Sequence, residues 1–343
     1  MATQVILLVH GMGTHPPGEI TTTFKNALND RATCFDLDFD IDQQDCVLEE
    51  YNYSEFFDQI RQQFADNAAA RQEGFAFLAG AGTAAELIQE LTLLEAKFNK
   101  DEFIYTHWLD VLLYGTTYFG NRIHAQFAEK FNDLVSQYGH GNIHVICHSL
   151  GTAVVHDTFA KLYRPGANIF DGIPDYPPGN FNIMTLWTFA NVSRLLNLLN
   201  GLADPNQSTV APGGNGCTNY FLNIRHELDP FTWFKQYKRE MNDLTHLEND
   251  VVRNINTHDF YEYVTAPLVS RYLLAMIFDK QVDQGKYDAC VTQYQQGSIS
   301  EGVDELKSAL EAVRDDPSLN DLQKAFKAYK ALVEAVKATG VDI

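Results

Sequence analysis

The stretch "HVICHSLGT", residues 144–152, joins an apolar, β-rich run to a sequence that is typical of a helix. Its centre, Ser149, stands where a strand would end and a helix would begin. A sharp turn at this junction can present a serine hydroxyl openly to a base, at the cost of strained backbone dihedrals. The residues two positions away must then be small, which Gly151 satisfies fully and Cys147 moderately. Cys147 itself would be buried in the strand. The simpler alternative is that Ser149 only caps the following helix.

Strand and helix patterns alternate on both sides of this stretch. Short apolar or β-rich runs predict strands at residues 4–9, 46–53, 142–148, 181–190 and within 218–230. Helical spacing predicts helices at residues 19–31, 54–72, 104–137, 151–163 and 258–278. This alternation predicts an α/β fold with a mostly parallel central sheet and helices on both faces. Ligands in such sheets bind beyond the carboxyl ends of the strands, which directs attention to the loops after residues 9, 53, 148, 190 and 225.

Two further segments lie outside this alternation. The apolar, glycine-studded stretch 74–100 lacks a strand period and predicts an inserted helical cap. The tail, 280–343, carries two helical patterns separated by "DDPS". We therefore expect a domain at 1–279 with a helical cap insertion near 74–118, and a C-terminal helical extension at 280–343 packed on that domain. The cap and "LLNLLNGL", 195–202, are candidates for covering a pocket, although the same residues could simply fill the core.

Composition excludes several classes of function. The chain has 343 residues and a net charge of -20, and such a surface repels nucleic acid and anionic lipid. No apolar run is long enough to span a bilayer and the start lacks the pattern of a secretory signal, so we expect a cytoplasmic protein without stable membrane insertion. The five cysteines are scattered, without a C-x-x-C pair. They argue against a disulfide framework and a thiolate zinc site, and predict free, mostly buried thiols.

An acid and a histidine follow the serine in chain order. Asp229 ends "YFLNIRHELD" just past a predicted strand, and His258 lies in a loop before a helical run. A base that touches a serine hydroxyl and is oriented by a carboxylate can activate that hydroxyl. Other occupants of these roles remain open: the acids are Glu227, Asp243 and Asp259, and the bases are His226 and His246.

Upstream, "VHGMGT", residues 9–14, is glycine-rich and could leave backbone N–H groups available as donors, or could be an ordinary turn after a strand.

Together these motifs resemble an α/β-hydrolase-fold serine esterase or lipase. The residues that carry the resemblance are "VHGMG" at 9–13, "CHSLGT" at 147–152, "ELDPF" at 227–231 and "NTHDFYEY" at 256–263. The resemblance implies that Ser149 is the nucleophile, His258 the general base and acid, and Asp229 the orienting carboxylate. It also implies an oxyanion hole formed by the N–H groups of Met12 and Leu150. The supporting motif positions are His10, Gly11, Gly13, His148 and Gly151. The chain departs from the family at Cys147, where glycine is usual, in the long interval before Ser149, and in the 280–343 tail.

The expected function is hydrolysis of a carboxylic ester through an acyl-enzyme, with a small-molecule ester or acyl substrate and no metal or cofactor. A thioesterase or an acyltransferase would use the same residues. A hydrolase-fold protein that has lost activity and serves as a binding module is an alternative of a different class. The helical elements leave a homodimer open, although packing of the tail within the chain is the simpler expectation.

Overall fold

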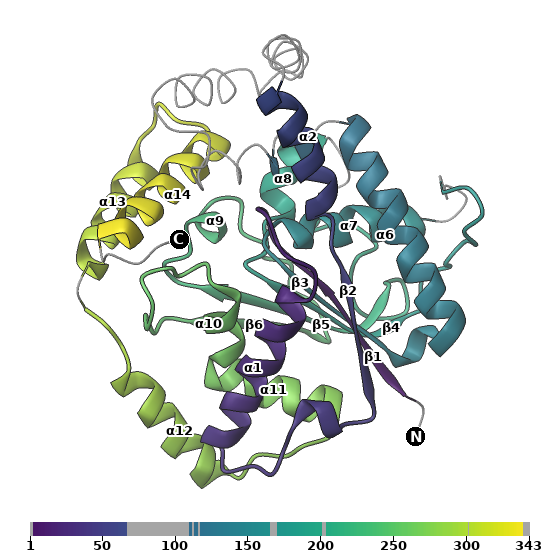
Figure 1. Ribbon diagram of the computed structural model, residues 1–343, viewed down its shortest axis with the longest axis horizontal. Coiled ribbons are helices and arrows are strands. Elements are labelled where there is room, and N and C mark those ends of the chain that lie inside the picture. Colours follow the sequence, from purple (N-terminus) through teal and green to yellow (C-terminus); the bar gives the residue numbers. More distant parts are fainter. Residues whose placement is uncertain are drawn as a thin grey trace.

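The computed structural model has a six-stranded parallel sheet flanked by helices (Figure 1). The structure describes residues 3–66, 110–111, 113–115, 117–164, 170–200, 204–300 and 302–338. The expected cap at 74–100, and most of its extension to 118, lies outside these residues. The strands are β1 (Gln4–Val9), β2 (Cys46–Tyr51), β3 (Ile143–His148), β4 (Ile183–Phe189), β5 (Thr218–His226) and β6 (Leu244–Asn249). Every strand pairs in parallel with its neighbours in the order β2-β1-β3-β4-β5-β6, which confirms the predicted α/β class.

The helices form two layers because the strands alternate their apolar side chains between the two faces. Val5, Leu7 and Val9 of β1 belong to one core, and Ile6 and Leu8 to the other. The first core is covered by α2 (Ser54–Asp66), α6 (Thr117–Tyr138), α7 (Leu150–Leu162) and α8 (Ser193–Asn200). The second is covered by α1 (Glu19–Cys34), α10 (Phe260–Thr265), α11 (Pro267–Phe278) and α12 (Gln284–Gln296). Both faces of the sheet are therefore buried, as parallel sheets require.

The strand order reverses between β1 and β3. The chain passes from β1 outward to β2, then returns to place β3 on the other side of β1. The loops that leave β1 and β3 consequently diverge at the same edge of the sheet, and such a switch point is where ligands bind in open α/β sheets. The loop after β1 begins at His10, and Ser149 directly follows β3. The two glycine-containing motifs of the sequence therefore meet at this edge.

Three local predictions were wrong. The strand β6 was not predicted, because only Leu247 and Asn249 of its residues are buried and an edge strand of this kind carries a weak apolar pattern. The helical run 258–278 is two helices, α10 and α11, because Pro267 starts a new helix. The described part of the tail holds three helices instead of two: α12 precedes α13 (Val303–Asp315) and α14 (Asp321–Ala338). The polar α12 is capped by Asp283, whose side chain accepts from two backbone N–H groups.

The last two helices pack against the segment that follows Asp229. In Figure 1, α13 and α14 are yellow and lie beside the short helix α9 (Pro230–Trp233). Leu306, Leu310 and Leu332 of this pair are buried in the same core cluster as Phe231 of α9. The helical pair thus lies against the segment that directly follows Asp229. None of the described helices is long and apolar enough to cross a membrane.

A disulfide joins Cys34, at the end of α1, to Cys290 of α12. The expectation of free thiols was therefore wrong for these two residues, while Cys46, Cys147 and Cys217 are free. Scattered spacing could not reveal the pair, because the two cysteines are 256 residues apart in sequence and meet only when α12 packs on α1. Disulfides persist mainly in oxidising compartments, so this bond lends no support to the expected cytoplasmic location.

We expect this disulfide to stabilise the fold. A cross-link that closes so long a loop restricts the unfolded chain and typically contributes about 2–4 kcal/mol. Denaturant unfolding with and without reductant measures the difference, and a Cys34→Ser/Cys290→Ser double variant should be as labile as the reduced protein and insensitive to reductant. Five reactive thiols in the unreduced, denatured protein instead of three would contradict the bond.

Candidate functional site

Ser149 occupies a strained turn between β3 and α7. Its backbone has φ 52° and ψ −125°, a conformation that non-glycine residues rarely adopt. The Ser149 N–H donates to Phe189 O at 2.9 Å, which ties the turn to the end of β4. Because α7 begins at the next residue, the side chain stands at the carboxyl edge of the sheet and in front of a helix N-terminus.

The two simpler accounts of this turn do not hold. Ser149 stands at the N-cap position of α7, yet its side chain makes no capping hydrogen bond. Cys147 is fully buried in β3, where its thiol donates to Trp187 O at 3.2 Å. Burial raises the pKa of the Cys147 thiol well above its ordinary value, so it is a poor nucleophile. The hydroxyl of Ser149 is therefore the group that this turn presents.

Two glycines allow the β1 loop and the β3 turn to touch. A Cβ atom on Gly151 would lie 2.4 Å from His10 O, and one on Gly11 would lie 2.9 Å from Ser149 Cβ. Neither position has room for a side chain. Small residues are therefore required both at Gly151, on the helix side of the turn, and at Gly11, in the loop that faces the turn.

Ser149, His258 and Asp229 form a continuous hydrogen-bonded chain. His258 Nε2 lies 2.8 Å from Ser149 Oγ, and His258 Nδ1 lies 2.8 Å from Asp229 Oδ2. A carboxylate oxygen only accepts, so Nδ1 carries the proton and Nε2 is the acceptor for the serine hydroxyl. This arrangement lets the ring take the serine proton while the carboxylate holds the ring in place. The structure thus brings together the three residues proposed from the sequence.

The carboxylate of Asp229 is held by two further donors. The N–H of Phe231 donates to Oδ1 at 2.9 Å, because Asp229 is the N-cap of α9. The hydroxyl of Tyr263 donates to Oδ2 at 2.6 Å and accepts from the N–H of His226 at 3.0 Å. Burial raises the pKa of Tyr263 well above its ordinary value, so the hydroxyl keeps its proton. Sequence reasoning missed the role of Tyr263, although its side chain lies in the motif "NTHDFYEY".

His148 connects the β3 turn to the loop that carries His258. Its Nε2–H donates to His258 O at 3.0 Å, and the two rings lie 4.8 Å apart between centroids. Burial lowers the pKa of His148 well below its ordinary value, so this ring stays neutral. It fixes the backbone of His258 and leaves the ring of His258 free to face Ser149.

The other acids and bases named from the sequence do not meet the serine. Asp259 caps α10, while Glu227 and Asp243 are exposed. His226 accepts from the N–H of Leu228 through Nδ1, and His246 lies on β6 with Nε2 3.0 Å from Arg239 O. These contacts explain their positions without any part in the Ser149 chain.

The peptide between Gly11 and Met12 is anchored through its oxygen. Gly11 O accepts from His10 Nδ1–H at 2.7 Å and from the hydroxyl of Tyr53 at 2.6 Å, and the same hydroxyl also lies 2.9 Å from His10 O. The N–H of Tyr53 donates to His10 Nε2 at 3.1 Å, which leaves the His10 proton on Nδ1. Burial lowers the pKa of His10 to about 3, so the ring is neutral. In a trans peptide the N–H points away from the C=O, so this anchoring fixes the direction of the Met12 N–H.

The next peptide is anchored at both ends. Met12 O lies 3.0 Å from His15 Nε2, and the N–H of Gly13, where φ is 100°, donates to Asp110 Oδ2 at 2.8 Å. Gly13 therefore has no donor left to offer a ligand. Within the described residues we find no acceptor for the N–H of Met12 or of Leu150. These two groups, from the β1 loop and the β3 turn, are the donors assigned from the sequence.

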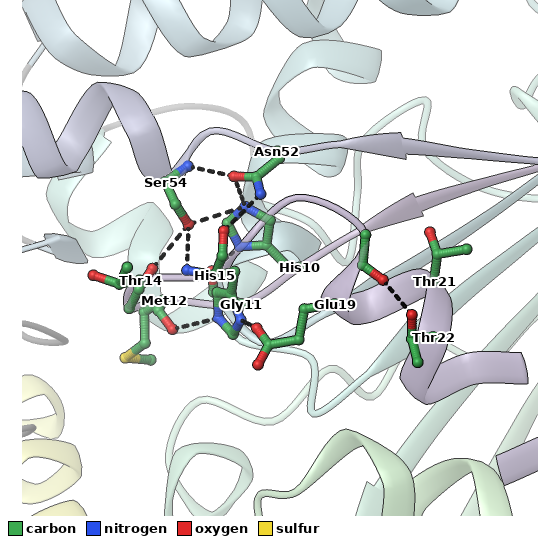
Figure 2. Close-up of polar contacts among 12 residues, drawn as sticks. His10, Gly11, Met12, Thr14, His15, Glu19, Thr21, Thr22, Asn52 and Ser54 are labelled. Carbon is green, nitrogen blue, oxygen red and sulfur yellow. Dashed lines mark hydrogen bonds and ion pairs between the residues drawn. The ribbon is translucent and has the colours of Figure 1, made fainter. Parts of the chain in front are cut away.

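Figure 2 shows how the segment after β2 supports this loop. Asn52 Nδ2–H donates to His15 O at 2.7 Å, and the hydroxyl of Ser54 donates to Gly13 O at 3.0 Å. The hydroxyl of Ser54 also accepts from the N–H of His15 at 3.1 Å. The loop after residue 53 was expected to matter because it follows a parallel strand. The residues that brace the β1 loop are Ser54, which directly follows residue 53, and Asn52, which was predicted to lie in the strand and instead follows it. No local pattern reveals these contacts between segments far apart in the sequence.

A pocket of about 290 Å³ opens beside Ser149. The helix α1 contributes Ile20, the loop before α10 contributes Asn256, and α14 contributes Tyr329. The segment "LLNLLNGL" was a candidate for covering a pocket or for filling the core; Leu195 and Leu196 are buried in the core beside α7 and do not line this pocket, and its side chains from residue 198 onward lie outside the described ones. Part of the wall instead comes from the C-terminal helical pair, a role that the sequence did not reveal.

A second Ser-His-Asp chain lies away from this pocket. Ser208 Oγ lies 2.9 Å from His156 Nε2, and His156 Nδ1 lies 2.9 Å from Asp157 Oδ1. The N–H of Val210 donates to Ser208 Oγ at 3.2 Å, and the hydroxyl of Tyr114 donates to Asp157 Oδ2 at 2.6 Å. The cavity beside His156 is only about 10 Å³, too small for a substrate. This network links α7 to the loop before β5, and Ser208 provides an internal control for Ser149.

No protein-family model matches this chain, and no curated protein matches it in sequence. The chemistry of the site therefore rests on its own geometry. Within the described residues no cluster of three His, Cys, Asp or Glu side chains is arranged to hold a metal ion. The arrangement that remains is a serine hydroxyl with a positioned base, an orienting acid and two backbone donors.

Proposed function

We propose that this protein is a serine hydrolase of the α/β-hydrolase fold that cleaves carboxylic esters. The observation that carries the proposal is the 2.8 Å approach of His258 Nε2 to a serine hydroxyl held on a strained turn. Strain of this kind persists where the surrounding structure enforces it, and it is concentrated at functional sites. A strand–turn–helix context is also the one in which the α/β-hydrolase nucleophile is found.

The proposed reaction has two halves. Ser149 Oγ attacks the ester carbonyl while His258 Nε2 takes the hydroxyl proton, and the carbonyl oxygen becomes an oxyanion facing the N–H groups of Met12 and Leu150. The intermediate collapses when the C–O bond to the alcohol breaks and His258 returns the proton to the leaving alcohol. Water, deprotonated by His258, then attacks the acyl-enzyme, and the acid leaves as Ser149 regains its proton.

Steady-state hydrolysis of an activated short-chain ester tests the function. We expect turnover by the intact protein and by a Ser208→Ala variant, since the described cavity beside His156 of the second Ser-His-Asp chain is only about 10 Å³. The matching thioester, and an added alcohol acceptor, separate the ester hydrolase from the thioesterase and the acyltransferase. Absence of turnover with every acyl donor would favour the binding-module alternative and refute the proposal.

Tyr53→Phe is expected to lower kcat with little change in KM. The substitution removes one of the two donors that hold Gly11 O and so loosens the Met12 N–H, whose stabilising effect is realised in the transition state. The loss should be smaller than the roughly 10²–10³-fold that follows removal of an oxyanion donor itself. Tyr51→Phe is the matched control, because Tyr51 is a buried tyrosine of the adjoining strand whose hydroxyl donates instead to Ile123 O. Equal kinetics in the two variants would contradict this role.

A further inference from the structure

The pocket beside Ser149 is closed on one side by the C-terminal helix α14. Tyr329, which is 2% exposed, lines this pocket together with Ile20 and Phe260, and Ser149 and His258 line the same space. A residue 180 positions after the serine in sequence thus contacts the same cavity. Because the wall at Tyr329 is an aromatic ring on a helix, its shape is more rigid than a loop would make it.

One aromatic ring, that of Phe231, lies between the ring of Tyr329 and the base, His258. Tyr329 packs on Phe231 with centroids 4.8 Å apart, and Phe231 packs on His258 with centroids 4.5 Å apart. Phe231 also donates its N–H to Asp229. The position of the pocket wall is therefore coupled to the same segment that orients the His-Asp pair.

Three polar contacts hold the helical pair against that segment. Lys235 pairs with Asp321 at 3.1 Å, and Lys307 lies 4.0 Å from Glu227. The guanidinium of Arg314 lies 5.5 Å from the centre of the Trp233 ring. Each such exposed contact stabilises little on its own. Together with the buried leucines of α13 and α14 they fix the pair in one orientation.

The size and charge of the pocket restrict what it can hold. Its volume of about 290 Å³ lies just below the usual range for ligand sites, roughly 300–1,000 Å³. The described lining includes the acids Glu19 and Asp259 and neither lysine nor arginine. His15 of this lining is already paired with Glu19 at 2.6 Å, so a carboxylate on the substrate would find no unpaired cationic partner among the described lining residues and would face the carboxylate of Asp259. The pocket therefore fits a short, uncharged group.

We propose that the site accepts short, uncharged acyl groups and that Tyr329 of α14 sets the limit on their length. This inference rests on the proposed function. A larger cavity at position 329 should admit a longer chain, since each methylene that gains or loses a fitting pocket changes specificity by about 10-fold or more. The phenol hydroxyl is not needed for this role, because the length limit comes from the volume of the ring.

A series of alkyl fluorophosphonates, from ethyl to octyl, tests the length limit without requiring turnover. Ser149 Oγ bonds to phosphorus, fluoride leaves, and His258 takes the serine proton. In the wild type we expect the labelling rate to fall steeply between the short and the long probes. In Tyr329→Ala the octyl-to-ethyl ratio of labelling rates should rise by about 10-fold or more. Tyr329→Phe should keep the wild-type ratio.

Leu332→Ala is the matched control for a cavity in the same helix. Leu332 is 1% exposed and does not line the pocket, so its loss should loosen α14 without changing the ratio. Tyr329→Leu, which keeps an apolar side chain in the core, serves if the alanine variant fails to fold. The inference is overturned if the wild type labels equally with all chain lengths, or if Tyr329→Ala and Tyr329→Leu keep the same ratio as Leu332→Ala. Failure of every probe to label the wild type would instead refute the proposed function.

Discussion

Replacing Ser149 with alanine is expected to lower ester turnover by about 10⁴-fold or more, to a residual rate supported only by binding and the two backbone donors. The reason is that no other described hydroxyl or thiol contacts both His258 and the pocket. Alanine removes only the hydroxyl, so the strained turn and the pocket should remain. Steady-state kinetics with an activated ester, together with circular dichroism to check the fold, measure the effect.

Ser208→Ala is the control that makes this result specific. It removes the hydroxyl of a second Ser-His-Asp chain with nearly the same distances, but without a positive φ at the serine and with a described cavity of only about 10 Å³ beside His156. We expect its turnover to stay within about two-fold of wild type, as for a substitution outside the reacting groups. Loss of activity in Ser208→Ala and its retention in Ser149→Ala would move the reaction to the other serine.

His258→Ala and Asp229→Asn are expected to lower kcat by about 10⁴-fold each. His258→Ala removes the base, and Asp229→Asn can offer an N–H where the ring needs an acceptor, which favours the wrong tautomer. The two effects should not add in the double variant, because the residues act as one unit. Steady-state kinetics of the single and double variants measure this.

His246→Ala is the matched histidine control, since His246 lies on β6 and contacts Arg239 O and Asn223 instead of the serine. It should retain wild-type kcat. Wild-type rates in His258→Ala would show that this ring is not the base, and additive losses in the double variant would show that His258 and Asp229 do not act as one unit.

Much of the fold follows from local patterns. The continuous apolar run "QVILLV" is long enough for one buried strand and too short for a helix, so β1 is readable from the sequence. The strand β6 cannot be read from the sequence, because it lies at the edge of the sheet and buries few apolar residues. The disulfide between Cys34 and Cys290 is also invisible locally, since it depends on how α12 packs against α1.

The candidate site likewise has some features that the local sequence predicts and others that it does not. The turn at Ser149 carries its signal in adjacent residues, so its geometry can be predicted from a few letters. The hydroxyl of Tyr53 and the ring of Tyr329 act across the fold, on Gly11 O and on the pocket wall. Nothing in the sequence near either tyrosine distinguishes it from an ordinary core residue. Contacts of this kind can be identified only from the tertiary structure.

The central claim is that Ser149 is a nucleophile activated by His258, and the site of covalent labelling tests it most directly. A fluorophosphonate should modify the native protein once, and peptide mass spectrometry should locate the adduct on Ser149, with labelling retained in Ser208→Ala and lost in Ser149→Ala and in the heat-denatured protein. An unlabelled native protein, or an adduct that persists in Ser149→Ala, would contradict the account.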